Sequence, residues 1–465
     1  MTLDVENPYL SLADLARAYR SGAARPSEVT RAQLDRIERL NPKIGAFQTI
    51  YAEDAMMMAE AADRLFATGM AVGPFHGIPF GLKDICDVEG RVTTGGSKAM
   101  ADRVSPVTGT LARRLFAAGG IMLGKTKTVE CAFGGWGTNQ KMGTPWNPWD
   151  MDTPRVPGGS SSGTGTGVAA GMAICGVGTD TGGSVRLPAA YCGLVGLKVT
   201  EGRLPTDGIL PLSHTLDTPG PMARSVEDAL LMFLAMDGAE GWAIERDQRK
   251  AQGLFGDLAR GVTGLRLGIM DAQERAACAA DVLDAYDAAL DLLRHLGADL
   301  VPFSASRPYA DLTAACGTLI GAEGYFHHRN LYDQPDLPLD EDVRGRMLAA
   351  RDVTALDYQQ MLVDRARGKA GYLDLMNGFD ALLTPSMTTT APALKDVDQA
   401  ISPGHFTRHV NYFGMCALSV PSGLSEAGLP TSLQVIARPD DEAMALRVGA
   451  AFEAARSPIA WPELT

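Results

Sequence analysis

Two glycine-rich loops carry serines whose setting favours nucleophilic chemistry. The first spans 157–163 (PGGSSSG) and the second includes 181–184 (TGGS). Because glycine adopts the φ values that a nest of successive N–H groups requires, the second loop can direct several N–H groups toward one point. Such a nest is how an oxyanion hole is built. The run of Thr181, Gly182, Gly183 and Ser184 is therefore able to form an oxyanion hole with its N–H groups.

A serine nucleophile needs a base at neutral pH. The chain has seven histidines, but none can be assigned to a Ser-His-Asp arrangement. Lys83, in contrast, lies in an apolar segment, 76–84 (HGIPFGLKD), that is typical of a short buried strand. Burial lowers the pKa of a lysine because it penalises the charged form. Lys83 is therefore the candidate base.

Three other catalytic patterns fit the sequence less well. Residues 119–126 (GGIMLGKT) have the spacing of a phosphate-binding loop, but a helical segment precedes them and their middle is typical of a strand. Residues 159–163 fit G-x-S-x-G around Ser161, but no buried apolar strand leads into them. No lysine follows a serine by three residues, so the S-x-x-K pattern is absent. A nucleotide hydrolase is thus the weaker alternative.

The two serine loops together with Lys83 resemble the signature of the amidase signature family. The resemblance covers essentially the whole chain and is strongest from about 74 to 230. It implies an amidase that cleaves a non-peptide carboxylic amide C–N bond without a cofactor or a metal. The segments that carry it beyond the loops are 74–84 (PFHGIPFGLKD), 123–126 (LGKT), 147–150 (NPWD), 192–198 (CGLVGLK), 217–220 (DTPG), 382–385 (LLTP) and 428–430 (GLP).

The resemblance also implies roles for individual residues. Lys83 is the expected base, Ser160 the bridging serine after a cis peptide bond, and Ser184 the acylated nucleophile. Neutral Lys83 would draw a proton through Ser160 as Ser184 attacks the amide carbonyl, and water would then hydrolyse the acyl-enzyme. The backbone near Ala132 is expected to line the substrate cleft.

Two further interpretations of the activity stay open. The runner-up is the A subunit of a tRNA-dependent amidotransferase, which hydrolyses glutamine and passes ammonia to a partner protein. A non-catalytic scaffold is a third interpretation, but it would be expected to have lost one of Lys83, Ser160 and Ser184, and all three are present. Asp180 and Arg186 flank the nucleophile loop and are expected to form a buried structural ion pair rather than to recognise substrate.

The elements that position these residues alternate between helix and strand, which indicates an α/β fold. Helices are expected over 11–40 (two, with Ser11 and Ser27 as caps and Asn41-Pro42 as the stop), 53–67, 108–118, from 225, and 280–296. Strands are expected over 76–84, 121–123, 176–179, 265–270 and 298–303. The small-residue stretch between the serine loops suggests a closely packed helix that leads into a central strand.

The resemblance predicts a single large amidase signature domain over 1–465 with a mixed central β-sheet covered by helices on both faces. Within it, 1–70 would hold N-terminal helices, 71–230 the catalytic core, and 231–465 the remaining sheet, helices and substrate-pocket segments. The chain of 465 residues, 46% of them hydrophobic, is large enough to bury such a core.

Charge and composition limit the partners. The formal net charge of -13 argues against a nucleic-acid or anionic-membrane surface. No apolar run has the roughly 18 residues of a membrane span, and acidic residues stand where a signal peptide would be basic, so a cytoplasmic protein is expected. The seven cysteines show no C-x-x-C or zinc-type spacing and are expected to be reduced thiols. A homodimer is the expected association from symmetry statistics alone.

The substrate is expected to be a small-molecule amide whose size the sequence leaves open. Parts of 130–140, 310–330 and 400–415 are expected to line its pocket. Six aromatic residues could favour an aryl or indole amide, although a structural role is favoured for each, and aliphatic amides stay open: Trp136, Trp146, Tyr325, Phe326, Tyr412 and Phe413.

Overall fold

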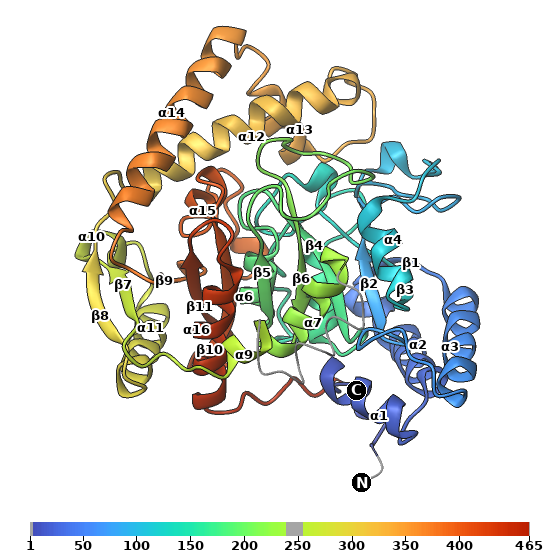
Figure 1. The fold of residues 1–465 in the computed structure, drawn as a ribbon. Coiled ribbons are helices and arrows are strands. Elements are labelled where there is room, and N and C mark those ends of the chain that lie inside the picture. The colour runs from blue at the N-terminus through green and yellow to red at the C-terminus, as the bar shows by residue number, and fades with distance from the viewer. Residues whose placement is uncertain (1–2, 239–253, 465) are drawn as a thin grey trace.

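A computed structural model describes residues 3–238 and 254–464. Its described strands form one 11-stranded sheet in the order β1-β3-β2-β4-β6-β5-β10-β11-β9-β7-β8 (Figure 1). The sheet is mixed, since β2 pairs in parallel with β3 and β4, whereas β4 and β6 are antiparallel. The strands are β1 (Phe47–Ile50), β2 (Pro79–Lys83), β3 (Ile121–Thr126), β4 (Cys175–Asp180), β5 (Val195–Lys198), β6 (Thr218–Ala223), β7 (Arg266–Met270), β8 (Asp299–Phe303), β9 (Ala381–Pro385), β10 (Cys416–Leu424) and β11 (Pro430–Ala437).

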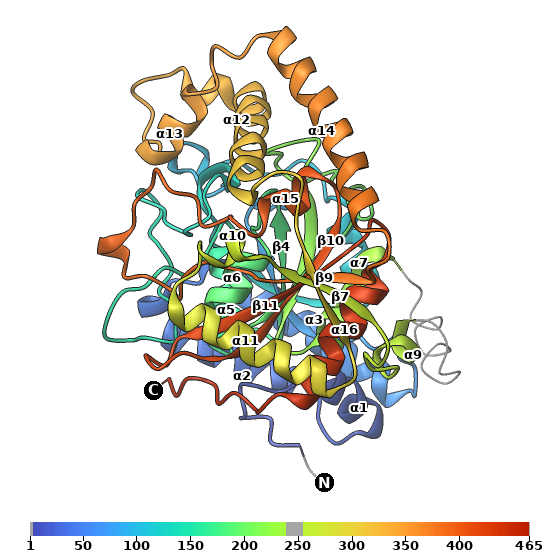
Figure 2. The same cartoon turned by 90° about the vertical axis from the view of Figure 1, so that its left-hand side faces the viewer.

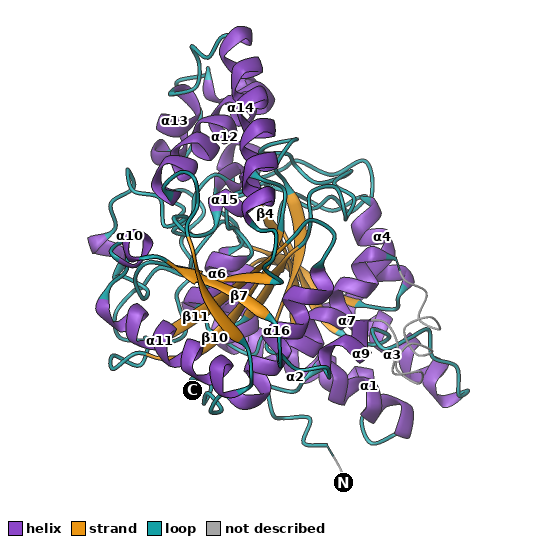
Figure 3. Cartoon of the chain, turned by 60° about the vertical axis from the view of Figure 1, so that its left-hand side comes forward, coloured by secondary structure: helices purple, strands orange, loops and turns teal. Residues whose placement is uncertain are grey.

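Helices surround this sheet along the whole described chain (Figure 3). Short 3₁₀ turns occur at Lys98–Met100, Glu130–Ala132 and Leu394–Asp396. The helices are α1 (Leu12–Ser21), α2 (Pro26–Ile44), α3 (Ala52–Ala67), α4 (Thr110–Ala117), α5 (Ser162–Ala169), α6 (Arg186–Tyr191), α7 (Val226–Asp237), α9 (Leu254–Leu258), α10 (Ala272–Arg275), α11 (Ala280–His295), α12 (Tyr309–Tyr332), α13 (Glu341–Leu348), α14 (Ala355–Leu375), α15 (Arg408–Tyr412) and α16 (Glu442–Ala455).

The sheet is covered on both faces, as predicted. Successive side chains of a strand point to opposite faces. A Cβ on Gly196 of β5 would lie 2.7 Å from Ala189 of α6, so α6 packs on that face. Leu418 of β10, which is opposite the next residue of β5, instead meets Gly449 of α16. The two helices therefore lie on opposite faces, and Figure 2 shows the strands between α5 and α6 on one side and α7 and α16 on the other.

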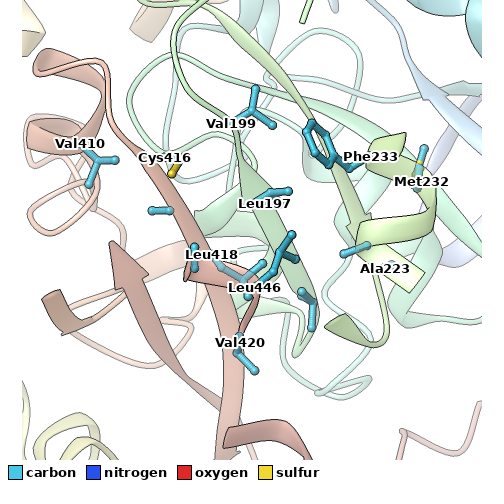
Figure 4. Close-up of a cluster of buried hydrophobic side chains, with 14 of the residues drawn as sticks. Leu197, Val199, Ala223, Met232, Phe233, Val410, Cys416, Leu418, Val420 and Leu446 are labelled. Atoms are coloured by element: carbon cyan, nitrogen blue, oxygen red, sulfur yellow. The ribbon is translucent and has the colours of Figure 1, made fainter. Parts of the chain in front are cut away.

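The core lies where β5 and β10 meet helices α7 and α16 (Figure 4). α7 is buried along nearly its whole length, which explains why its sequence, VEDALLMFLAMD, is apolar on most of its circumference. Each fully buried leucine, methionine or phenylalanine side chain stabilises the fold by about 1.5 to 3 kcal/mol. The labelled members of this cluster are Leu197, Val199, Ala223, Met232, Phe233, Val410, Cys416, Leu418, Val420 and Leu446.

The small-residue stretch between the serine loops forms α5, and the prediction of a closely packed helix is confirmed. All eight residues of α5 are buried. A Cβ on Gly163 would lie 2.2 Å from the carbonyl oxygen of Ala46, and Gly176 of β4 leaves room for Thr164 of α5. Glycine is thus needed here because other backbones approach the helix more closely than a larger side chain allows.

Two predicted signals near the N-terminus were wrong. Ser11 does cap α1, accepting a hydrogen bond from the N–H of Asp14, but α2 begins after Arg25 with Pro26 as its first residue, and Ser27 is not the cap. α2 also continues to Ile44 through Asn41-Pro42. Gly45, in a left-handed conformation, ends the helix instead.

Helices α12, α13 and α14 project from one edge of the sheet (Figure 1). α12 contacts α13, α14 and α15, and α15 leads into β10. This helical projection stands above the end of β4, the strand that precedes Ser184 (Figures 1 and 2). Residues of α12 and α13 line the same cavity as that serine.

Candidate active site

Lys83 is the last residue of β2, and its side chain is fully buried. Its Nζ donates a hydrogen bond to Ser160 Oγ at 2.8 Å and another to Thr179 Oγ1 at 2.7 Å. Thr179 belongs to β4, a strand that pairs with β2, so the threonine and the lysine lie on neighbouring strands. Sequence reasoning did not assign a role to Thr179, although it lies in the predicted strand.

Burial lowers the pKa of Lys83 to about 7 because the ammonium loses its water. The negative charges of Asp217 and Asp180 oppose this effect only in part. Among the described residues, Lys83 forms no ion pair with a carboxylate. A large fraction of Lys83 is therefore neutral at pH 7, and the neutral amine can accept a proton.

Ser160 lies in the loop before α5, and the peptide bond between Gly159 and Ser160 is cis. Its carbonyl oxygen accepts hydrogen bonds from Val129 N at 3.2 Å and Thr128 Oγ1 at 3.0 Å. A Cβ on Gly159 would lie 2.5 Å from a neighbouring carbonyl oxygen, so only glycine fits before this serine. These contacts hold the Ser160 hydroxyl at Lys83.

Ser184 follows β4 and precedes α6. Of Lys83, Ser160 and Ser184, it is the residue that lines a cavity. It is 7% exposed, whereas Lys83 and Ser160 are fully buried. No hydrogen bond joins the hydroxyls of Ser160 and Ser184 in the described part of the chain. Hydrogen bonds between catalytic groups are often long or poorly aligned before substrate binds.

In the predicted oxyanion loop, some N–H groups lack an acceptor among the described residues, whereas another already donates a hydrogen bond within the protein. The N–H of Gly183 donates to Asp180 Oδ1 at 2.8 Å. Within the described residues, the N–H groups of Gly182 and Ser184 have no acceptor. Thr181, Gly182 and Ser184 line the cavity described below, and Gly183 does not.

Asp217 stabilises this loop through a hydrogen bond with Thr181. Its carboxylate accepts hydrogen bonds from Thr181 Oγ1 at 2.5 Å and from the backbone N–H groups of Leu212 and Ser213. Burial raises the pKa of Asp217 to about 6, although these hydrogen bonds and the charge of Lys83 act in the opposite direction. Asp217 was recognised only as part of a motif, and its place beside the loop was not predicted.

Asp180 and Arg186 form the predicted buried ion pair, with Arg186 Nη2 at 2.9 Å from Asp180 Oδ1. Burial alone would raise the pKa of Asp180, but the charge and hydrogen bonds of Arg186 hold it well below its usual range. Asn411 and Gln434 take further guanidinium N–H groups of Arg186. Neither Asp180 nor Arg186 lines the cavity, which agrees with a structural role.

A cavity of about 410 Å³ opens in front of Ser184. Parts of all three predicted segments line it, including Ala132 to Trp136, several residues of α12, and the stretch from 399 to 403. Ala132 has a φ of 59°, within a turn that bends its backbone toward the cavity. The sequence did not identify the contribution of Arg346 on α13, nor that of Ala349, Ala350 and Val353 in the segment after it.

The aromatic candidates are mostly elsewhere. Trp136 lines the cavity, whereas Tyr325 and Phe326 line a different hollow on the helical projection. Trp146, Tyr412 and Phe413 line neither of them. Apart from Trp136 and Phe133, the walls are made chiefly of small and aliphatic side chains, glycine backbone and two arginines.

The rival motifs have structures that do not suit their chemistry. The G-x-x-x-x-G-K-T segment contains strand β3, in which every residue is buried. Its Lys125 donates hydrogen bonds to Cys86 O and Thr93 Oγ1, so the lysine does not face a phosphate-sized space. Ser161, the centre of G-x-S-x-G, is fully buried and bonds to the backbone of Thr179.

The described residues contain no group of His, Cys, Asp and Glu side chains that could hold a metal ion. None of the described helices is long and apolar enough to cross a membrane. All seven cysteines are free thiols, and six are buried.

Comparisons with known proteins identify the family and agree with the fold. Residues 28–446 match the family described as Amidase. The chain therefore belongs to the amidase family, whose members carry the amidase signature, and it is an enzyme that acts on amide C–N bonds.

Individual relatives fall into more than one functional group. The chain is 36% identical to the A subunit of glutamyl-tRNA(Gln) amidotransferase from Geobacter metallireducens, over 92% of this chain and 93% of the relative. It is 34% identical to 2-amino-5-chloromuconic acid deaminase of Comamonas testosteroni, over 96% and 97%. Its structure resembles that of peptide amidase from Stenotrophomonas maltophilia, with a TM-score of 0.83, 29% identity and coverage of 97% and 99%. The comparisons thus establish the family and leave the substrate open.

Proposed function

We propose that the chain is an amidase that hydrolyses a non-peptide carboxylic amide to a carboxylate plus ammonia or an amine through an acyl-enzyme on Ser184. One observation carries this proposal. The Nζ of Lys83, with a pKa of about 7, lies 2.8 Å from Ser160 Oγ, and the N–H of the next residue, Ser161, donates to the carbonyl oxygen of Ser184, which lines the cavity. These contacts support a base, a hydroxyl relay and an accessible nucleophile at one place.

The first half of the reaction forms the acyl-enzyme. Ser184 Oγ attacks the amide carbonyl while its proton passes to Ser160, whose own proton passes to neutral Lys83. This transfer needs the Ser184 hydroxyl to turn toward Ser160 when substrate binds. The developing oxyanion lies against the N–H groups of Gly182 and Ser184.

The oxyanion hole is proposed in a form modified from the sequence-based prediction. Gly182 and Ser184 have free N–H groups at the cavity wall, and Thr181 lies beside them there. The N–H of Gly183 holds Asp180, so Gly183 shapes the loop rather than serving as a donor. Its φ of 128° and a Cβ position 2.3 Å from Thr407 Oγ1 require glycine at this point.

The second half releases both products. Protonated Lys83 returns its proton through Ser160 to the departing nitrogen as the C–N bond breaks. Water then attacks the Ser184 ester, gives a proton to the same relay, and the carboxylic acid leaves as the Ser184 oxygen is reprotonated. Lys83 and Ser160 finish in their starting protonation states, so the relay is regenerated.

The test is product release by the purified chain from a panel of amides. Glutamine, small aliphatic amides, indoleacetamide and anilides cover the groups that the sequence left open. Turnover that disappears in Ser184→Ala, and falls by several orders of magnitude in Ser160→Ala and Lys83→Ala, is the expected result. Full activity in Lys83→Ala with a folded protein contradicts the mechanism.

A second candidate function is that of the glutamine-hydrolysing component of a tRNA-dependent amidotransferase. The 36% identity to the Geobacter metallireducens protein favours it. Such a component would be nearly inert by itself and would need its partner proteins for ammonia transfer. Glutaminase activity that appears only after partner proteins and the aminoacyl-tRNA are added would favour this candidate over the stand-alone amidase.

A further inference from the structure

The cavity in front of Ser184 is lined by positive charge. Its lining contains two charged side chains, Arg346 and Arg408, and no Asp, Glu or Lys. The two arginines are far apart in the sequence, on α13 and at the first position of α15. The fold therefore brings two positive charges into the lining of one otherwise largely apolar cavity.

Arg408 adjoins the proposed oxyanion loop. A Cβ on Gly182 would lie 3.2 Å from Cγ of Arg408, so the stem of the arginine packs directly on that glycine. One guanidinium N–H donates to the carbonyl oxygen of Thr313 on α12 at 3.2 Å. This contact commits one of the five N–H donors of Arg408 and brings no negative charge.

Arg346 lies beside Phe133, which also lines the cavity. Its Nε donates to the carbonyl oxygen of Phe133 at 3.1 Å, and its guanidinium lies 5.6 Å from the centre of the Phe133 ring. A longer hydrogen bond of 3.5 Å joins it to Gln399 Oε1. Arg346 thus commits two of its five donors to the protein, again to neutral groups.

Neither arginine has a carboxylate partner. The ion pairs of the described residues do not include Arg346 or Arg408. Burial lowers the pKa of Arg346, the charges of Asp340 and Asp342 act against this without forming an ion pair, and the like charge of Arg408 adds to it. Burial also lowers the pKa of Arg408. Arginine stays charged in proteins, so the cavity holds two partly desolvated cations without an anion.

We propose that the substrate is an amide that carries a carboxylate, which Arg346 and Arg408 bind; this rests on the proposed amidase function. A guanidinium presents a planar fork of donors that matches a carboxylate. The same lining offers no acid for a substrate ammonium, so an amide acid without an amino group fits it better than an amino acid such as glutamine. The apolar walls suit the carbon chain between the amide and the carboxylate.

The experiment measures binding to Ser184→Ala by isothermal titration calorimetry with two matched pairs of ligands. Succinamate and butanamide differ by a carboxylate on the acyl side, and N-acetylglycine and N-ethylacetamide differ by one on the amine side. The acid of at least one pair is expected to bind about 10- to 100-fold more tightly than its neutral partner, as hydrogen bonds to a charged group do. The pair that responds shows which side of the amide faces the arginines.

Two variants and a control connect the preference to the arginines. Arg346→Gln and Arg408→Gln, each combined with Ser184→Ala, are expected to reduce the ratio of acid to neutral affinity by about 10-fold or more. Arg346→Lys keeps a positive charge and is expected to restore part of the ratio. The exposed Arg294 of α11, which pairs with Asp291, provides the control Arg294→Gln, whose ratio stays that of the parent. Circular dichroism confirms that each variant is folded.

The outcomes separate this inference from the proposed function. Three outcomes overturn the carboxylate site. They are equal affinity for the acid and its neutral partner, no binding of either acid, and a ratio of acid to neutral affinity that is unchanged in both arginine variants. Turnover of neutral amides that depends on Ser184 would leave the amidase function standing in that case. Carboxylate-dependent binding together with turnover that persists in Ser184→Ala would instead contradict the nucleophile and keep the carboxylate site.

Discussion

Replacing Thr179 with valine isolates the electrostatic tuning of Lys83. Thr179 is buried, and its hydroxyl has one partner among the described residues, the Nζ of Lys83 at 2.7 Å. Valine keeps the shape of threonine and removes that acceptor. The charged form of Lys83 then loses a hydrogen bond that contributes about 1.5 to 3 kcal/mol, so its pKa falls further.

The size of the effect follows from that energy. At about 1.4 kcal/mol for each pH unit, the loss corresponds to about 1 to 2 pH units. Lys83 has a pKa of about 7 in the native protein and must be neutral to accept a proton. The acid limb of kcat/KM is therefore expected to have its midpoint near pH 7 in the wild type and at about pH 5 to 6 in Thr179→Val.

The assay is the pH profile of kcat/KM for the best amide of the panel. Thr179→Ser keeps a hydroxyl and should hold the limb near its wild-type position. Thr166→Val is the matched control, because Thr166 is a buried threonine that bonds within α5 to Ser162 O and does not contact Lys83. An acid limb that stays at the same pH in Thr179→Val, in a folded protein, refutes the assignment of that limb to Lys83.

Three further predictions concern stability. Gly159→Ala places a Cβ 2.5 Å from a carbonyl oxygen and should lower the free energy of unfolding by about 1 to 3 kcal/mol in urea titrations, whereas Gly371→Ala, in open space on α14, should not destabilise the fold. Asp180→Asn leaves the buried charge of Arg186 without its counter-ion and should cost about 3 to 5 kcal/mol in the same assay; an unchanged denaturation midpoint would contradict the structural role of the pair. The pKa of Lys83 is 10.5 when the lysine is exposed and about 7 in the fold, so between these pH values the unfolded chain binds more protons than the folded chain. The free energy of unfolding of the wild type should therefore rise relative to that of Lys83→Met by up to about 5 kcal/mol from pH 7 to 10.5. Parallel stability curves for the two proteins over that range would show that Lys83 does not titrate as described.

The local sequence predicted the elements that hold the site. The expected strands at 121–123, 176–179 and 298–303 correspond to β3, β4 and β8, and the helix at 280–296 corresponds to α11. These segments combine apolar runs with clear glycine stops, so their signals are local. The helix end expected at Asn41-Pro42 was wrong, because α2 continues two residues past Pro42 and ends where Gly45 adopts a left-handed conformation.

The cavity could not be predicted in the same way. Arg346 and Arg408 line the same cavity because α13 and α15 both pack against α12, and no spacing in the sequence encodes that packing. The places of Thr179 and Asp217 depend on neighbouring strands. Thr179 lies in β4, which pairs with β2, and Asp217 directly precedes β6, which pairs with β4. Motif matching located the serines and Lys83, whereas the residues that select a substrate depend on tertiary packing.

The most direct test of the account is the site of covalent labelling by a sulfonyl fluoride, mapped by peptide mass spectrometry. The account predicts a single modification on Ser184, formed at least about 100-fold more slowly in Lys83→Ala because the hydroxyl then lacks its base. Labelling of Ser161 or another serine, or an unchanged labelling rate in folded Lys83→Ala, would contradict the central claim that Lys83 activates Ser184 through Ser160.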